Sequence, residues 1–288
     1  MIRYSIIIPH FDSLDTLPRA IESVPERKDI EILVIDNSAT PIAANLFAQR
    51  SNVHIHYSPY GKGAGAARNV GLQHARGQWL LMLDADDFFT PNAFDAMDKY
   101  ANSNADIVFF CATSCDSDTM AIADRMSDTN QLVNNYMRTN EEIGLRYGWC
   151  SPCAKMIKHS MVEAHAIRFE ETQVANDVLF SAQIGHRAKQ IAATKEIIYC
   201  ATVRQGSLTL TPTLNHLNER IAVFGRFNQY LSSQGIRAPR KSIMYYVYTI
   251  ARNYGYGKAI NALLTSMKSG NNPFYGITRW VNTVRNTR

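Results

Sequence analysis

The chain has 288 residues, of which 46% are apolar and 19% charged, a composition typical of a globular protein. Its length is sufficient for one large α/β domain with an appendage. The odd number of cysteines, 5, fits a reducing compartment better than a disulfide framework. No stretch reaches the roughly 18 apolar residues that cross a bilayer, and no signal peptide precedes the first apolar run. We therefore expect a cytoplasmic protein.

Segments typical of strands and helices alternate from the N-terminus. Apolar runs predict strands at residues 4–9, 31–35, 53–57, 78–83, 106–111 and 197–203. The segments between them predict helices at residues 16–24, 41–50, 64–75 and 91–101. This alternation is typical of an α/β fold with a mostly parallel central sheet flanked by helices. The polar stretch at residues 113–135 predicts an irregular segment beside the functional site.

Three carboxylates, Asp84, Asp86 and Asp87, directly follow the apolar run at residues 78–83. In open α/β sheets, ligands bind at the carboxyl ends of strands, and Mg²⁺ takes one or two carboxylates together with substrate phosphates. We therefore predict Asp86 as a metal ligand, with Asp84 contacting the metal through water or holding a ribose. For Asp87 we favour a structural role as a cap or an ion pair. A plain solvated acidic turn is the alternative for the whole cluster.

A glycine-spaced loop at residues 61–71 leads into a helix of small residues that carries Lys62 and Arg68 near its start. Glycines let backbone N–H groups approach a phosphate, a helix N-terminus favours an anion, and an arginine fork can pair with phosphate oxygens. A solvated loop lysine is the alternative for Lys62. Because the acidic cluster follows within one βαβ unit, the two features together predict a site for a diphosphate and a divalent cation.

At these residues the chain resembles family 2 of the inverting, nucleotide-sugar-dependent glycosyltransferases, which have the GT-A fold. The resemblance covers roughly the first 210 residues and rests on the segments 5–12, 32–38, 67–71, the DxD motif at 84–86, 176–180 and 199–209. Three departures stand out, namely Pro-His-Phe-Asp at the first strand end, Asp-Asn-Ser at the second, and Asn176 where the family has glutamate. Without that acidic neighbour, we expect the pKa of Asp177 to be less elevated.

The resemblance implies roles for individual residues. Asp177 corresponds to the general base that deprotonates the acceptor hydroxyl. Without the resemblance, its position before an apolar run would instead favour a helix N-cap. Asp36 corresponds to the aspartate that accepts a hydrogen bond from uracil. Phe11 replaces the usual tyrosine and retains a face on which the base can stack, with core packing as the alternative. Pro9 and Ala85 complete the nucleotide-sugar site that the resemblance implies.

Four of the cysteines form two closely spaced pairs, a pattern that can indicate a zinc site. Cys111 and Cys115 form one pair, and Cys150 and Cys153 form another. Four thiolates can hold zinc, but Cys111 ends an apolar run, and the spacing of the first pair is loose. We therefore expect thiols buried in the core or in loops.

The C-terminal region is strongly basic and helical in pattern. Of the 30 Lys and Arg residues, 11 lie from Arg220 onward, whereas all 25 Asp and Glu residues precede it, so a body of charge −6 joins a tail of charge +11. Helices are predicted at residues 217–231 and 242–254, after a loop at 206–209. Tyrosine and tryptophan side chains interleave with the cations, which predicts attachment to an anionic membrane surface. A basic structural cap is the alternative, and no motif supports nucleic-acid binding.

Together these features predict a catalytic domain at residues 1–212 and a helical, basic extension at 213–288. Within the domain we expect a nucleotide-sugar half at about 1–111 and an acceptor half at about 112–212. The resemblance implies an inverting hexosyl- or N-acetylhexosaminyl-transferase that uses a UDP-sugar and Mn²⁺ or Mg²⁺. Its expected acceptor is a glycan or a polyprenyl-diphosphate-linked sugar, used in bacterial surface polysaccharide synthesis at the inner face of the membrane. A sugar-nucleotide pyrophosphorylase and a non-catalytic glycan-binding protein are the alternatives.

Overall fold

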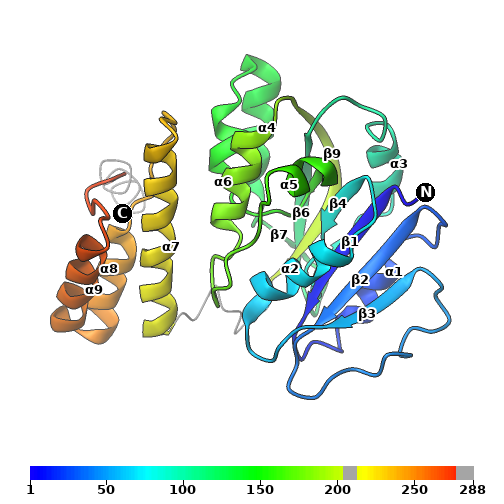
Figure 1. Cartoon of the computed structure of the whole chain (residues 1–288), viewed down its shortest axis with the longest axis horizontal. Helices are drawn as coiled ribbons and strands as arrows, with labels where there is room; N and C mark the ends of the chain where they lie inside the picture. The colour runs from blue at the N-terminus through cyan, green and yellow to red at the C-terminus, as the bar shows by residue number, and fades with distance from the viewer. Residues whose placement is uncertain (204–212, 277–288) are drawn as a thin grey trace.

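The computed structural model describes residues 1–203 and 213–276, in which one sheet is packed against helices and three further helices lie to one side (Figure 1). The strands are β1 (Tyr4–His10), β2 (Ile30–Asp36), β3 (Val53–Tyr57), β4 (Trp79–Met82), β5 (Phe88–Phe89), β6 (Ile107–Asp116), β7 (Ile122–Ala123), β8 (Lys155–Lys158) and β9 (Ile191–Val203). The helices are α1 (Leu17–Glu22), α2 (Gly63–His74), α3 (Ala93–Asp98), α4 (Ser127–Thr139), the π-helical turn Gly144–Gly148, α5 (His159–Ala164), α6 (Val178–Arg187), α7 (Leu214–Ser233), α8 (Met244–Tyr254) and α9 (Tyr256–Lys268).

The sheet is mixed, and its strand order is β3-β2-β1-β4-β8-β6-β9-β5, with β7 paired to β6. Strands β3, β2, β1 and β4 are parallel, as the alternating pattern predicts. Strand β8 is antiparallel to both of its neighbours, β4 and β6, and β6 runs parallel to β9. In the parallel half, the register pairs His10 with Asp36 and Ile7 with Met82. The chain therefore leaves β1, β2 and β4 at the same edge of the sheet, where ligands bind in folds of this kind.

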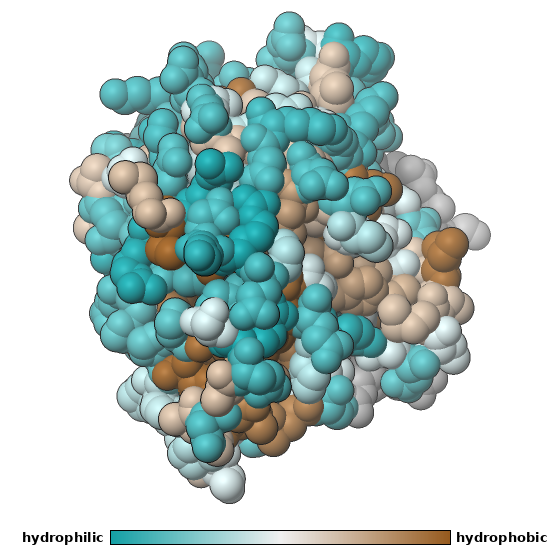
Figure 2. Space-filling view, turned by 90° about the vertical axis from the view of Figure 1, so that its right-hand side faces the viewer, coloured by the Kyte–Doolittle hydropathy of each residue, from teal (hydrophilic) through white to brown (hydrophobic). Residues whose placement is uncertain are grey.

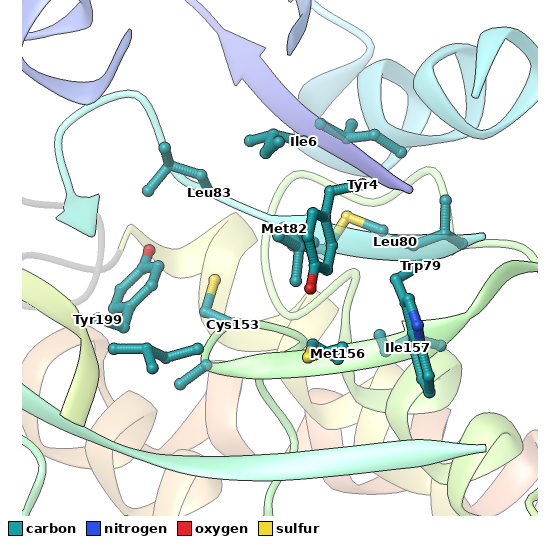
Figure 3. Close-up of a cluster of buried hydrophobic side chains, with 14 of the residues drawn as sticks. Tyr4, Ile6, Trp79, Leu80, Met82, Leu83, Cys153, Met156, Ile157 and Tyr199 are labelled. Atoms are coloured by element: carbon teal, nitrogen blue, oxygen red, sulfur yellow. The ribbon is translucent and has the colours of Figure 1, made fainter. Parts of the chain in front are cut away.

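The core lies beneath that edge and holds β4 in place. All four β4 residues are buried, and the indole nitrogen of Trp79 donates a hydrogen bond to the carbonyl of Ala101 at 2.9 Å. Figure 3 shows side chains of β1, β4 and β8 packed together, including Ile6, Met82 and Met156. Because a strand buried on both faces cannot shift without exposing apolar surface, the turn after Leu83 has a well-defined position.

The helix predicted at residues 41–50 is wrong, because this segment forms turns. Its backbone and side chains bond to neighbouring elements instead. The amide of Ile42 donates to a carboxylate oxygen of Asp36 at 2.9 Å, and the guanidinium of Arg50 donates to the carbonyls of Ile21 and Val24, each at 2.7 Å. These tertiary bonds compete with the hydrogen bonds that a helix would make.

The expectation of an irregular segment at residues 113–135 is also wrong. Strand β6 continues to Asp116, β7 pairs with it, and α4 follows. The polar side chains that suggested a loop bond to backbone within these elements. Asn130 donates to the carbonyl of Ala112 at 2.8 Å and accepts from its amide at 2.9 Å, and Ser114 donates to the carbonyl of Ala123 at 2.7 Å.

The C-terminal helices pack against the body and against each other. Helix α7 contacts the body through Val223 and Phe227, which meet Val178 of α6, and α8 packs on α7 through Ile243 and Val247. The helices predicted at 217–231 and 242–254 are thus confirmed. The loop expected at 206–209 lies outside the described residues, and the boundary expected between residues 111 and 112 falls inside β6. No helix in the described ranges has both the length and the hydropathy to cross a membrane.

Candidate active site

The three carboxylates after β4 have different surroundings. Asp87 is buried and accepts hydrogen bonds from the Tyr199 hydroxyl at 2.6 Å and the Thr202 amide at 2.7 Å. Burial, together with the charges of Asp86 and Asp84, raises the pKa of Asp87 to about 8. These contacts tie β9 to the turn, so the structure gives Asp87 the structural role favoured from the sequence, with a hydroxyl and an amide as partners.

Asp84 and Asp86 reach the surface of the turn. Asp84 is paired through Oδ1 with Arg68, and its side chain is 38% exposed. Arg19 donates to the backbone carbonyl of Asp86 at 2.8 Å, and the Thr202 hydroxyl donates to it at 3.0 Å, so the backbone is fixed, while part of the residue remains open to solvent. Loss of surrounding water and the charge of Asp84 raise the pKa of Asp86.

Two partly exposed carboxylates suit a divalent cation that also binds a substrate. In residues 1–203 and 213–276, no group of three or more His, Cys, Asp or Glu side chains is arranged to hold a metal ion alone. Mg²⁺ is commonly held by one or two carboxylates with phosphate oxygens and water completing its shell. Asp84 and Asp86 therefore fit an ion that is completed by a nucleotide, and they do not form a closed metal site.

Arg68 bridges three segments of the site. Its two terminal nitrogens donate to Asp84 at 2.6 Å and to the side-chain oxygen of Asn176 at 2.7 Å, and its guanidinium lies over the ring of Phe169 at 5.4 Å. The guanidinium is buried, and its position links α2, the turn after β4 and the segment before α6. The phosphate-binding role of Arg68 stays a prediction, since both ends of its fork already contact protein.

The glycines of the 61–71 loop have a packing role that the sequence did not reveal. A Cβ atom at Gly65 would lie 1.9 Å from the carbonyl oxygen of Glu170, and Gly63 has φ +82 beside the carbonyl of Thr172. Only glycine permits this approach, so the loop lets the 170–176 segment lie against the start of α2. Lys62 is exposed at the start of this helix, and its contact with a ligand stays a prediction.

That packing positions Asp177, which directly precedes α6. The Asp177 carboxyl makes no capping hydrogen bond with the helix, although the residue occupies the N-cap position. Burial raises its pKa, Asp84 raises it further, and the charges of Arg68 and Lys155 oppose the rise. The loss of an acidic neighbour at Asn176 therefore does not remove the elevation, because burial is the largest cause.

A cavity of about 280 Å³ lies at the ends of β1 and β2 and at the start of α2. It is lined by Pro9, His10, Phe11, Asn37, Gly61, Gly63, Ala64, Gln173 and His216. The Phe11 ring is 48% exposed and stacks with Tyr60 at a centroid distance of 6.0 Å and an interplanar angle of 23°. Phe11 is therefore available to a ligand, and the core-packing alternative is wrong.

Asp36 is not among the residues that line this cavity. Its carboxylate accepts hydrogen bonds from Ser38 Oγ at 2.6 Å, from His10 Nδ1 at 2.9 Å and from the Ile42 amide. Burial alone would raise the pKa of Asp36, but the bonds from Ser38 and His10 outweigh it and hold this pKa below the usual range. Its contact with a uracil base stays a prediction, because these internal bonds occupy both oxygens.

Asn37 lines this cavity, whereas Asp36 does not. It is 2% exposed, and its Nδ2 donor has no hydrogen-bond partner in the described part of the chain. A buried amide donor without a partner is costly, which makes it a candidate for contact with a ligand. Its position at the end of a parallel strand could have identified Asn37 from the sequence. For Gln173 and His216, which also line this cavity, the local sequence holds no comparable signal.

A second cavity, of about 630 Å³, opens from Asp84 toward α4 and the 148–153 segment. Its polar lining includes Arg125, Asp128, Gln131, Asn135, Ser151 and Lys241, and Trp149 forms part of its wall. Lys155, buried and with its pKa lowered to about 7 by burial, donates to the carbonyl of Trp149 at 3.0 Å and so supports that wall. Residues 113–135 were expected beside the functional site, and residues of this segment do line this cavity. The segment is regular, however, because it forms the end of β6, β7 and α4.

The cysteines do not assemble into one cluster. Cys111, Cys115 and Cys153 are buried and Cys150 is half-buried, as free thiols. Cys115 lies 3.4 Å, sulfur to sulfur, from Cys200 of β9. The described residues bring no third metal-binding side chain to either pair. These thiols therefore lie in the core and in a loop of the second cavity.

The parallel strands β3, β2, β1 and β4, followed directly by an acidic turn and continued by a mixed half-sheet, form a GT-A fold. The model of glycosyl transferase family 2 matches residues 5–165, more than half of the chain, and the chain belongs to this family. It is 23% identical over 248 residues to the succinoglycan biosynthesis protein ExoO of Rhizobium meliloti, covering 81% of this chain and 70% of ExoO. It is 24% identical to the putative glycosyltransferase EpsH of Bacillus subtilis, covering 71% of this chain and 62% of EpsH.

Solved structures share the fold at low sequence identity. TarS from S. aureus, solved in complex with UDP-GlcNAc, superposes with a TM-score of 0.63 at 17% identity, covering 93% of this chain and 81% of that one. The mannosyltransferase PcManGT from Pyrobaculum calidifontis, in complex with GDP-Man and Mn²⁺, has a TM-score of 0.57 at 14% identity, covering 98% of this chain and 79% of that one. At these identities the likeness establishes the GT-A fold and leaves the substrates open.

Proposed function

We propose that this glycosyltransferase transfers a sugar from a UDP-sugar to an acceptor hydroxyl by an inverting, metal-dependent single displacement. The observation that carries the proposal is the shared network in which Arg68 joins Asp84 to Asn176, the residue before Asp177. Through this arginine, the turn that carries the candidate metal ligands is joined to the segment before α6 that carries the candidate base, whose carboxyl does not cap its own helix. A single displacement needs both, since one group stabilises the leaving diphosphate and the other deprotonates the acceptor.

Each part of the site has a proposed task. The smaller cavity holds the base, with the exposed face of Phe11 stacking on it and the unpartnered Nδ2 of Asn37 donating to a base carbonyl. Asp84 and Asp86 hold Mn²⁺ or Mg²⁺, which as a Lewis acid neutralises charge on the diphosphate. Asp177 accepts the proton of the attacking hydroxyl. In this arrangement Asp36 orients the 36–38 turn.

The acceptor is proposed to belong to surface polysaccharide synthesis. ExoO is named for succinoglycan biosynthesis, and this chain aligns with 70% of its length. The larger cavity, with its mainly polar lining, has room for a sugar and part of its carrier. We therefore assign the enzyme to the transfer of a hexose or N-acetylhexosamine onto a growing glycan or lipid-linked sugar.

A nucleotide panel tests the donor class. We expect UDP to raise the melting temperature more than GDP or TDP, and to do so much more strongly with Mn²⁺ than with EDTA, because binding to the folded state stabilises it by mass action. Thermal shift measures this directly, and hydrolysis of a panel of UDP-sugars then identifies the sugar. A preference for GDP would replace the UDP assignment, and a chain that binds no nucleotide would contradict the proposed function.

The C-terminal helices support attachment to a membrane surface. On α9, the side chains of Tyr256, Ile260, Leu264 and Met267 are exposed at helical spacing, beside a region with no acidic residue after Glu219. By contrast, the face on the far side of the molecule from α8 and α9 is predominantly hydrophilic (Figure 2). We propose that this α9 stripe inserts among anionic headgroups while the surrounding cations attract the surface.

Substitutions on α9 test the attachment without disturbing its packing. The double change Ile260→Glu and Leu264→Glu should lower affinity for phosphatidylglycerol vesicles at least about tenfold, because each buried aliphatic side chain contributes about 1.5–3 kcal/mol. Co-sedimentation measures the loss, and attachment of the native chain should weaken as salt rises. Ile122→Glu is the matched control, since Ile122 is 93% exposed on β7. If the native chain ignores these vesicles at low salt, the helices are a structural cap.

A further inference from the structure

Lys241 is held at the larger cavity by a buried amide. It follows α7, and the Asn228 side chain of α7 bonds both of its backbone groups. The Nδ2 atom of Asn228 donates to the Lys241 carbonyl at 2.8 Å, and the Lys241 amide donates to Asn228 Oδ1 at 2.9 Å. Asn228 is itself buried. The backbone of Lys241 is therefore fixed, unlike that of a lysine on a surface loop.

The side chain of Lys241 lines the cavity that begins at Asp84. Among the lining residues in the described ranges, it alone comes from the region after residue 213. The charge of its ammonium opposes the rise that burial causes in the pKa of the Cys150 thiol, and both residues line this cavity. None of the ion pairs formed between residues in those ranges includes Lys241. A half-buried cation outside these ion pairs has donors left for an anion.

Lys241 and the diphosphate of the donor are expected in different parts of the cavity. The donor diphosphate belongs at the acidic turn, where Asp84 and Asp86 hold the metal. Arg125, the other arginine or lysine lining the cavity, donates to the carbonyl of Thr202 at 2.9 Å, and the Thr202 hydroxyl in turn bonds the Asp86 carbonyl of that turn. Lys241 instead lines the cavity together with Cys150, whose carbonyl accepts a hydrogen bond at 2.5 Å from Ser181 in the first turn of α6, the helix that Asp177 precedes. We take this end of the cavity as the place where the acceptor hydroxyl approaches the base.

We propose that Lys241 binds an anionic group on the acceptor, so that the acceptor of this enzyme carries a phosphate or a carboxylate close to the hydroxyl that is glycosylated. This inference rests on the proposed function, since it takes Asp177 as the base. The C-terminal helices thereby contribute directly to acceptor selection. A phosphate would come from the carrier of a lipid-linked sugar, and a carboxylate would come from an acidic sugar of the glycan.

The test compares acceptor kinetics in variants that keep the shape of the side chain. Lys241→Met retains the aliphatic stem and removes the charge, and it should raise the KM for an anionic acceptor about 10- to 100-fold, the range expected for loss of a charged hydrogen bond. Lys241→Arg should restore most of the affinity. Lys28→Met removes an equal charge from an exposed site on the body and should change nothing.

Three soluble acceptors separate the sources of the anion, namely a short-chain lipid diphosphate sugar, a uronic acid glycoside and the matching neutral glycoside. The KM of the native enzyme should be lowest for one of the anionic acceptors, which identifies the anion, and Lys241→Met should abolish that preference. UDP affinity, measured by calorimetry with Mn²⁺, should be the same in all variants.

Two results would overturn the inference. An unchanged acceptor KM in Lys241→Met, with UDP affinity normal, would remove this proposal and leave the proposed function intact. A loss of UDP affinity in Lys241→Met would assign the lysine to the donor instead. Failure of the native chain to bind any nucleotide is a different outcome, because it removes the proposed function itself and this inference with it.

Discussion

Replacing Asp177 by Asn is expected to lower sugar transfer by about 10²–10⁴-fold, the usual contribution of a general base. The amide keeps the size of the side chain and removes its basicity. Because the Asp177 carboxyl makes no capping bond to α6, the exchange should not disturb the helix. UDP affinity should be unchanged, since the base acts on the acceptor. Steady-state transfer and UDP calorimetry on the same samples measure both quantities.

The pH dependence of the native enzyme provides an independent check on the same residue. Burial raises the pKa of Asp177, so the carboxylate is lost on acidification at a higher pH than an ordinary aspartate. A base works only when deprotonated, so transfer should fall as the pH drops through this raised pKa, giving an acidic limb in the rate profile. The Asn variant should lack that limb.

Neighbouring acids supply the control for Asp177. Glu170 accepts a charged hydrogen bond from Arg226 at 2.5 Å, whereas Glu171 is exposed. Glu171→Gln should therefore transfer at the native rate. If Asp177→Asn keeps near-native transfer, or loses UDP affinity along with transfer, Asp177 is structural, and the base must be sought among other carboxylates of the site.

Replacing Asp86 by Asn is expected to abolish turnover and to reduce UDP affinity with Mn²⁺ to the metal-free value. An amide cannot supply the anionic oxygen that a hard divalent cation prefers, and Asp84 alone, paired to Arg68, leaves the ion with one protein carboxylate. Calorimetry of UDP binding with Mn²⁺ and with EDTA separates loss of the metal from loss of the nucleotide site.

Asp118→Asn is the control for this experiment, because Asp118 is an exposed acid in the turn between β6 and β7. It should bind UDP and turn over substrate like the native chain. Full activity in Asp86→Asn, or native turnover that EDTA leaves unaffected, would show that Asp86 is not a metal ligand and that the reaction needs no divalent cation.

Elements that depend on short-range patterns could be predicted from the order of the amino acids. Strands β1, β2, β4 and β6 are visible as apolar runs, since a buried strand needs side chains that avoid water on both faces. Strand β3, at the edge of the sheet, is visible through the alternation of apolar residues and histidines in Val53–Tyr57. The acidic turn is equally local, because it directly follows β4. The helix α2 is predicted by its small residues, and the family resemblance follows from the same short motifs.

Contacts between side chains that are distant in the chain depend on how the elements pack. The insertion of β8 between β4 and β6 makes the sheet mixed, and no local sequence pattern predicts this insertion. Arg68 and Asn176 lie 108 residues apart in the chain and still share a hydrogen bond, and Lys241 reaches the cavity from the C-terminal helices. The bonds to Ile42 and from Arg50 likewise override helix propensity at residues 41–50. In each case the partner is set by how buried elements pack together, and a short stretch of sequence holds no information about that packing.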